Sequence, residues 1–220
     1  KTLDDALRVS LAAAALKHRL ARLSWNDEIV ATLSPPEQRI GPAKITPPPG
    51  SFLQATQHGE TSLIETVGNI LKSASPVLDL FSGCGTFSLP LAQMAEIHAV
   101  EGEADMLAAL DKAWRKTQGL KKISHEKRDL FRRPLLLDEL NKFEAAVIDP
   151  PRAGAEAQVT MLAKSTIKTL AYVSCNPVSF ARDAKILTDA GYSLEAVTPV
   201  DQFRWSYHVE LVGAFHKAAA

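Results

Sequence analysis

The sequence predicts an α/β protein built on one seven-stranded, mostly parallel, doubly wound sheet that helices cover on both faces. From about residue 51 onward, apolar runs of strand length alternate with helical segments. The last two apolar runs are joined by a connection too short for a helix, so we expect the final strand to run antiparallel. Turns that carry glycine, proline or cysteine follow three of the predicted strands. Because the carboxyl ends of parallel strands meet at one edge of a sheet, these turns should share one crevice.

The beginning of the chain is predicted to be a small N-terminal α/β remnant. Residues 2–22 are rich in alanine and leucine, with acidic residues in the first turn and basic residues late, as in a helix. Residues 23–25 and 28–32 flank Asn26-Asp27 and predict a hairpin. The chain begins at Lys1, inside the predicted helix, so we expect it to be a fragment that lacks an N-terminal part.

A proline-rich stretch separates this remnant from the regular part of the sequence. Residues 34–50 contain six prolines and two glycines, which predicts a loop-rich junction. We therefore divide the chain into residues 1–49, the end of a central or linker domain, and residues 50–220, the main domain.

The elements of the main domain follow from its hydrophobic pattern. Helices are predicted over residues 60–73, 86–94, 103–117, 156–164 and 178–190, with a short segment around 135–141. Strands are predicted over residues 77–81, 97–101, 123–128, 145–149, 170–174, 194–200 and 209–215.

The composition excludes several classes of protein. With 46% hydrophobic and 23% charged residues, the 220-residue chain is typical of soluble globular proteins, and its apolar runs are too short to span a membrane. Its two cysteines have no nearby pair, which argues against a disulfide framework or a metal site and suits the cytoplasm. The 25 basic and 25 acidic residues give zero net charge, so composition alone does not indicate nucleic-acid binding.

The first of the three turns predicts a cofactor site. Gly83-Cys84-Gly85 follows a buried strand, where glycines let the backbone approach a ligand and Asp79 brings a carboxylate to the turn. Glu101 ends the next strand and could accept hydrogen bonds from ribose hydroxyls. Ser88 replaces the third glycine of a dinucleotide fingerprint, so the pattern favours S-adenosylmethionine over a nicotinamide cofactor. Asp129, after the third strand, could then meet the adenine. Purely structural glycines are the alternative.

The third turn predicts a nucleophile. Cys175 lies between an apolar strand and a helix, and the Asn176-Pro177 pair after it forces a turn. The positive end of the following helix should favour the thiolate. A free cysteine is otherwise more often a small core residue, which fits Cys84 better. Glu210 interrupts an apolar strand, where a carboxylate is costly unless it has a function, although an exposed face is the alternative.

Together the motifs resemble the RNA 5-methyluridine methyltransferases. The matching segments occur in this order: Leu78-Asp79-Leu80-Phe81-Ser82-Gly83-Cys84-Gly85, Asp149-Pro150-Pro151-Arg152-Ala153-Gly154, Val173-Ser174-Cys175-Asn176-Pro177 with Ala181-Arg182-Asp183, and His208-Val209-Glu210. The arginine at position 152, where adenine-methylating enzymes carry an aromatic residue, argues against amino-group methylation. The resemblance covers the chain from about Gly50 and implies the Rossmann-like fold of class I methyltransferases.

The resemblance also implies roles for individual residues. Cys175 matches the nucleophile that adds to C6 of uridine, and Glu210 matches the base that removes the C5 proton. The implied contacts to S-adenosylmethionine are Gln54, Phe81, Gly83, Gly85, Thr86, Glu101, Asp129 and Asp149. Thr86 and Asp129 stand where family members often carry asparagine, and Gln202-Phe203-Arg204-Trp205 replaces a more usual Phe-Pro turn.

The implied activity is methylation of uridine C5 in tRNA or rRNA. The expected enzyme is cytoplasmic and monomeric, binds no metal in this fragment and does not associate with a membrane. The neutral charge suggests that much of the RNA phosphate contact belongs to the missing N-terminal part. Two other functions stay open at this point. They are cytosine-C5 methylation of RNA, which also uses a cysteine nucleophile, and an RNA-binding module of the same fold without turnover.

Overall fold

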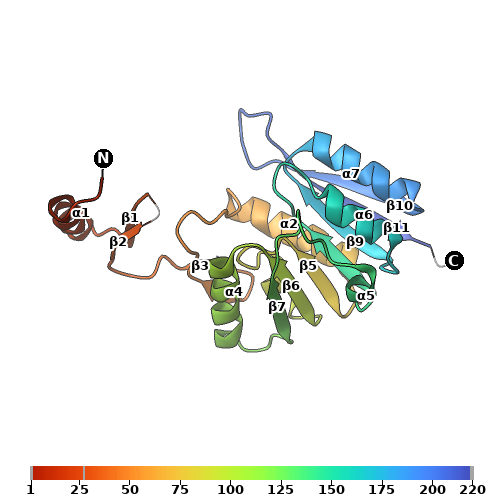
Figure 1. The fold of residues 1–220 in the computed structure, drawn as a ribbon, viewed down its shortest axis with the longest axis horizontal. Helices are drawn as coiled ribbons and strands as arrows, with labels where there is room; N and C mark the ends of the chain where they lie inside the picture. The colour runs from red at the N-terminus through yellow and green to blue at the C-terminus, as the bar shows by residue number, and fades with distance from the viewer. Residues whose placement is uncertain (1, 27, 219–220) are drawn as a thin grey trace.

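The computed structural model describes residues 2–26 and 28–218. Its largest element is one seven-stranded sheet. Across the sheet the strands lie in the order β10-β11-β9-β8-β5-β6-β7 (Figure 1). Their bounds are β5 (Val77–Leu80), β6 (Ile97–Glu101), β7 (Ile123–Lys127), β8 (Ala145–Ile148), β9 (Thr169–Ser174), β10 (Tyr192–Val200) and β11 (Glu210–Lys217).

The pairing of the strands confirms the predicted mostly parallel sheet. From β7 to β9, neighbouring strands pair in parallel. The last strand, β11, runs antiparallel to both β9 and β10, and it inserts between them, so that β10 forms the edge. This insertion brings the start of β11 beside the end of β9.

Helices cover both faces of the sheet, as expected. Their bounds are α2 (Gln57–Leu71), α3 (Ser88–Leu91), α4 (Ala104–Lys116), α5 (Leu137–Leu140), α6 (Glu156–Lys164) and α7 (Pro177–Asp189). Side chains of α2 and α4, such as Val67 and Leu110, belong to one apolar layer, and those of α6 and α7, such as Val159 and Leu187, to a second. The short α3 replaces the longer helix predicted over residues 86–94, because turns occupy the chain on both sides of it.

The N-terminal elements lie apart from the sheet, at the far left of Figure 1. Helix α1 (Asp5–Lys17) begins at Asp4, whose side chain accepts a hydrogen bond from the amide of Leu7. Strands β1 (Arg22–Trp25) and β2 (Glu28–Thr32) form the predicted antiparallel hairpin. Of its predicted turn, Asp27 lies outside the described residues.

A second hairpin lies inside the stretch that was predicted to be a loop-rich junction. Strands β3 (Gln38–Ile40) and β4 (Ala43–Ile45) pair antiparallel, and β4 packs on α4. The prolines that suggested a loop flank this hairpin, whereas the side chains of Ile40, Ala43 and Ile45 are buried in the same apolar layer as α4. The division of the chain at residue 50 stays a prediction.

Candidate functional site

A cavity of about 880 Å³ lies at the carboxyl ends of the parallel strands. This is the edge where open α/β sheets bind their ligands. The cavity contains nine of the ten predicted site residues: Gln54, Phe81, Gly83, Thr86, Glu101, Asp129, Asp149, Cys175 and Glu210. The tenth, Gly85, is buried beside it and does not line it.

The glycine turn after β5 is fastened to the end of β6. The amide of Gly83 donates to Oε2 of Glu101 at 2.9 Å, and the amide of Glu103 donates to Oε1 at 3.0 Å. These two bonds fix the carboxylate of Glu101 at the cavity wall. Gly85 has φ of +93°, and a Cβ there would lie 2.4 Å from Cδ1 of Leu110, so this glycine lets the turn pack closely on α4.

The carboxylate of Asp79 lies beside the glycine turn but does not line the cavity. Its side chain is completely buried, and Oδ2 accepts a hydrogen bond of 2.6 Å from the hydroxyl of Ser88. Oδ1 has no hydrogen-bond partner among the described residues. Burial raises the pKa of Asp79 to about 7. Side chains alternate between the two faces of the sheet along β5, so Asp79 lies on the same face as Val77, whose side chain belongs to the apolar layer of α2 and α4.

An aromatic pair lies at the β5 and β7 ends of the cavity. The ring centroids of Phe81 and Phe131 are 5.3 Å apart, with a tilt of 55° between the ring planes. The amide of Phe131 donates to Oδ1 of Asp129 at 3.0 Å, which holds the turn after β7 in place. Phe131 was not predicted as a site residue. Its position two residues after Asp129, at the same edge of the sheet, is the signal that could have found it.

Gln54 enters the cavity from the segment before α2. Its Oε1 accepts a hydrogen bond of 2.7 Å from Nε2 of Gln202, which lies in the loop between β10 and β11. Gln202 is almost buried, and its own Oε1 accepts from the amide of Thr56 at 3.3 Å. The loop after β10 is therefore tied to the same wall of the cavity as Gln54.

The insertion of β11 brings Cys175 and Glu210 together. Leu211 pairs with Ser174 in the antiparallel register, so the next pair places Glu210 opposite Cys175. Glu210 is only 5% exposed, and Cys175 is half-buried. Cys175 directly precedes Asn176, whose Oδ1 accepts from the amide of Val178 and caps α7. The thiol thus lies at the strand-to-helix turn that the sequence predicted.

The carboxyl groups around Cys175 act against its ionisation. Burial raises the pKa of its thiol, and the nearby Glu210 and Asp149 raise it further, whereas the guanidinium of Arg152 lowers it. The sequence could not show the carboxyls across the cavity, and in the structure they act with burial against the thiolate that the helix end was expected to favour. Burial also raises the pKa of Glu210 and, with Glu210 and Asp79 nearby, that of Asp149 to about 8.

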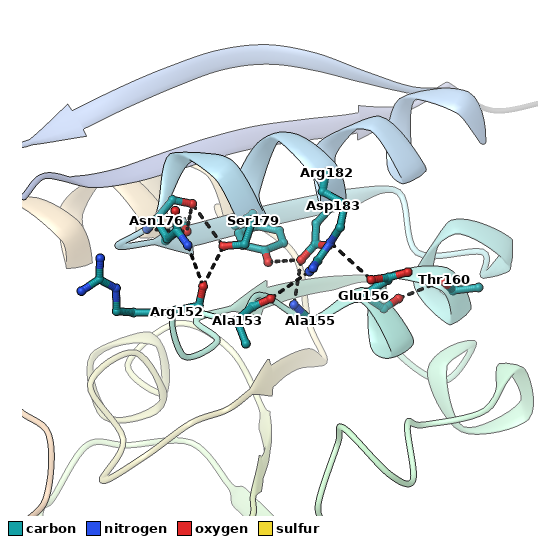
Figure 2. A network of polar contacts seen from close by, with 11 residues as sticks. Arg152, Ala153, Ala155, Glu156, Thr160, Asn176, Ser179, Arg182 and Asp183 are labelled. Carbon is teal, nitrogen blue, oxygen red and sulfur yellow. Dashed lines mark hydrogen bonds and ion pairs between the residues drawn. The ribbon is translucent and has the colours of Figure 1, made fainter.

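Hydrogen bonds clamp the Pro-Pro-Arg turn after β8 onto the first turns of α7 (Figure 2). The carbonyl of Arg152 accepts from Nδ2 of Asn176 at 2.9 Å and from the hydroxyl of Ser179 at 3.0 Å. The buried carboxylate of Asp183 accepts from the amide of Ala155 at 2.7 Å. The side chain of Arg152 extends away from this network and lines the cavity. Its motif was noted in the sequence, but its place in the site was not predicted.

The model of the tRNA (uracil-5-)-methyltransferase family matches residues 3–218. This match covers nearly the whole chain. The chain belongs to this family. The family resemblance and the predicted methyltransferase fold are thereby confirmed.

Two curated proteins illustrate the relatives with similar sequences. A protein of Mesorhizobium japonicum, described as an uncharacterized RNA methyltransferase, is 52% identical over 92% of this chain and 49% of its own length. The 23S rRNA (uracil(1939)-C(5))-methyltransferase of Shewanella halifaxensis is 37% identical over 78% of this chain and 39% of its own length. The chain thus spans about half the length of the curated relatives it matches.

A solved structure of the family has a similar fold. The tRNA (uracil-54, C5)-methyltransferase of Pyrococcus abyssi, in complex with S-adenosyl-L-homocysteine, aligns with a TM-score of 0.70 at 25% identity, covering 81% of this chain and 43% of that one. Within the part of this family member that the structure describes, no helix is long and apolar enough to cross a membrane.

Proposed function

We propose that this chain is the catalytic part of an S-adenosylmethionine-dependent methyltransferase that modifies C5 of uridine in tRNA or rRNA through a covalent adduct with Cys175. The observation that carries the proposal is the single cavity that holds the Cys175 thiol, the Glu210 carboxyl and the Gly83 turn together. Family members from Shewanella halifaxensis and Pyrococcus abyssi are named as uracil-C5 methyltransferases of rRNA and of tRNA.

The residues of the cavity fit S-adenosylmethionine. Its volume lies within the roughly 300–1,000 Å³ of ordinary ligand pockets. The carboxylate of Glu101, fixed by two backbone amides, is suited to accept hydrogen bonds from ribose hydroxyls. The rings of Phe81 and Phe131 offer apolar surface to an adenine, with Asp129 beside them. Gln54 and Thr86 supply further polar atoms. When bound, the cofactor supplies an electrophilic methyl group.

Cys175 makes C5 of uracil reactive. Once the thiol has passed its proton to the solvent, the sulfur forms a bond to C6, and the electron pair of the C5–C6 double bond moves towards the C4 carbonyl to give an enolate. C5 then becomes nucleophilic and can accept a methyl group. Among the neighbours of the thiol, Arg152 is the cation that favours the thiolate.

Glu210 completes the reaction as a base. Its carboxylate takes the proton from the methylated C5, the C5–C6 double bond re-forms, and the bond to Cys175 breaks to release the thiolate. The antiparallel register that places Glu210 opposite Cys175 suits this division of roles. Attack on C6 requires access to the face of the ring, so the target uridine must be unstacked or flipped out of a helix.

Two substitutions in the full-length protein test this proposal. Cys175→Ala should form neither methylated RNA nor a protein–RNA adduct, because no bond to C6 can form. Glu210→Gln keeps the nucleophile but lacks the base, so a methylated adduct should accumulate as a slow band on a denaturing gel, only with S-adenosylmethionine present.

The other cysteine provides a matched control. Cys84→Ala removes the thiol at the glycine turn and should still form the adduct. An adduct that persists in Cys175→Ala, or normal turnover by Glu210→Gln, contradicts the assignment. RNA in which cytidine replaces the target uridine separates the proposed activity from cytosine methylation, because only the uridine substrate should react.

A further inference from the structure

The loop between β10 and β11 exposes large aromatic side chains beside the cavity. Trp205 is fully exposed, and Tyr207 is 90% exposed. Such side chains normally bury a large apolar area, so two of them in water within one short loop suggest a binding surface. Phe203 and His208, from the same loop, line the cavity that holds Cys175. The exposed rings therefore belong to the same loop as two residues that line the candidate active site.

The rings form a connected series that leads outward from the cavity. The centroid of the His208 ring lies 6.3 Å from that of Phe203 and 4.5 Å from that of Tyr207. The Tyr207 and His208 planes are tilted by 37°. A ligand that extends out of the cavity along this loop would meet successive aromatic surfaces.

Hydrogen bonds of backbone amides within the loop fix the backbone that carries these rings. The amide of Phe203 donates to Oδ1 of Asp201 at 3.0 Å, and the amide of Ser206 donates to the carbonyl of Phe203 at 3.1 Å. The amide of His208 donates to the hydroxyl of Ser206, also at 3.1 Å. The base of the loop is anchored by Gln202, through its contacts with Gln54 and Thr56.

The backbone at the tip of the loop is unusual as well. Trp205 has a φ of +67°, a left-handed backbone conformation that residues other than glycine seldom adopt. Such strained residues cluster at active sites and ligand clamps, where the surrounding structure holds them in place.

We propose that Trp205 and Tyr207 form a stacking platform for an unpaired RNA base adjacent to the uridine in the cavity. This inference rests on the proposed function. A uridine that leaves its stack exposes one face of its neighbour, and unpaired bases in RNA bind by stacking on aromatic rings. The ring of Tyr207 is continuous with the cavity through His208, and Trp205 lies two residues before Tyr207 in the same loop, on the path that a neighbouring base would take out of the cavity.

Binding of a short RNA by the full-length protein tests the platform. The probe is a single-stranded 12-nucleotide RNA with one uridine, and a second probe carries abasic sites on both sides of that uridine. Trp205→Leu should weaken binding of the first probe about tenfold, because leucine keeps apolar surface but cannot stack. Trp205→Phe, the matched control, should recover most of the affinity. Tyr207→Leu should show a smaller loss of the same kind.

The abasic probe isolates the stacking contact. Wild-type protein should bind it at least as weakly as Trp205→Leu binds the intact probe, and Trp205→Leu should lose no more than the smaller contribution of Tyr207. The salt dependence of binding should be unchanged in Trp205→Leu, because no phosphate contact is removed. Affinity for S-adenosylhomocysteine should also be unchanged, which shows an intact fold.

Two outcomes would overturn the platform. One is equal binding of both probes by the wild-type protein. The other is a Trp205→Leu variant that loses thermal stability but no RNA affinity, which would mean that another segment of the longer protein covers the indole. The two proposals can also fail separately. If Cys175 forms no adduct but the protein still binds the intact probe more tightly than the abasic probe, the proposed function is rejected and the platform stands.

Discussion

At the scale of single residues, Asp149 links cofactor binding to pH. Burial, with Glu210 and Asp79 nearby, raises its pKa to about 8, so it holds a proton at neutral pH. A sulfonium cation in the cavity favours the carboxylate, so binding should release this proton. We expect the affinity for S-adenosylmethionine to rise from pH 6 to 8, by up to about tenfold per pH unit, and then to level off. Calorimetry at several pH values measures this.

S-adenosylhomocysteine lacks the sulfonium charge and should show a weaker dependence on pH. In the Asp149→Asn variant the dependence for S-adenosylmethionine should flatten. The unliganded protein should respond in the opposite sense: unfolded Asp149 ionises near its ordinary pKa of 3.8, while the folded protein keeps the proton, so stability falls as pH rises from about 4 to about 8. Equal pH profiles for both ligands would contradict this linkage.

Which site residues could be predicted depended on their place in the chain. Cys175, Glu101 and Asp149 come directly after or at the end of strands, and a hydrophobic pattern alone locates such positions. Phe131 and Phe203 contribute rings from longer turns, whose path depends on tertiary contacts that no local pattern encodes. The raised pKa of Cys175 was missed for the same reason.

At the scale of elements, Asp183 joins β9, the Pro-Pro-Arg turn and α7. It is completely buried and accepts hydrogen bonds from the hydroxyl of Tyr172 at 2.6 Å, the amide of Ala155 at 2.7 Å and the side chain of Arg182 at 2.8 Å. Asp183→Ala leaves these donors without their acceptor and should lower the free energy of unfolding by about 3 kcal/mol. Urea denaturation measures the loss.

The same helix offers a matched control. Asp189 pairs with Lys185 one turn earlier, both side chains being largely exposed, so Asp189→Ala should cost no more than about 0.5 kcal/mol. Similar losses in the two variants would mean that the buried network is not what stabilises this junction.

The order of strands and helices in the main domain was predictable because the hydrophobic residues of each element repeat with a clear period and turn residues mark where the element ends. The antiparallel direction of β11 followed from the short connection before it. The hairpin of β3 and β4 was missed because its strands have three residues each and lie among prolines. Its burial comes from packing on α4, a contact between segments about 60 residues apart.

At the scale of the whole molecule, the hairpin of β3 and β4 indicates where the folded unit begins. Ile40 and Ile45 are each only 1% exposed and belong to the apolar layer that contains α2 and α4. By contrast, α1 packs mainly on β1 and β2. Arg22 connects these elements to the rest through a hydrogen bond of 2.7 Å from its Nη1 to the carbonyl of Pro47. We therefore propose a start of the folded unit near residue 37, as an alternative to the predicted boundary at residue 50.

Two truncations test this boundary. A protein that begins at residue 37 should keep the unfolding midpoint and the S-adenosylhomocysteine affinity of the whole chain. One that begins at residue 47 loses both buried isoleucines and should lose about 4 kcal/mol of stability, because each buried isoleucine contributes roughly 2 kcal/mol. In the whole chain, Ile45→Ala should reproduce about half of that loss, whereas Ile29→Ala, at a half-exposed position of β2, should cost little. If both truncations are equally stable, the hairpin is not part of the core. If both are equally unstable, the unit begins before residue 37 and includes the N-terminal elements.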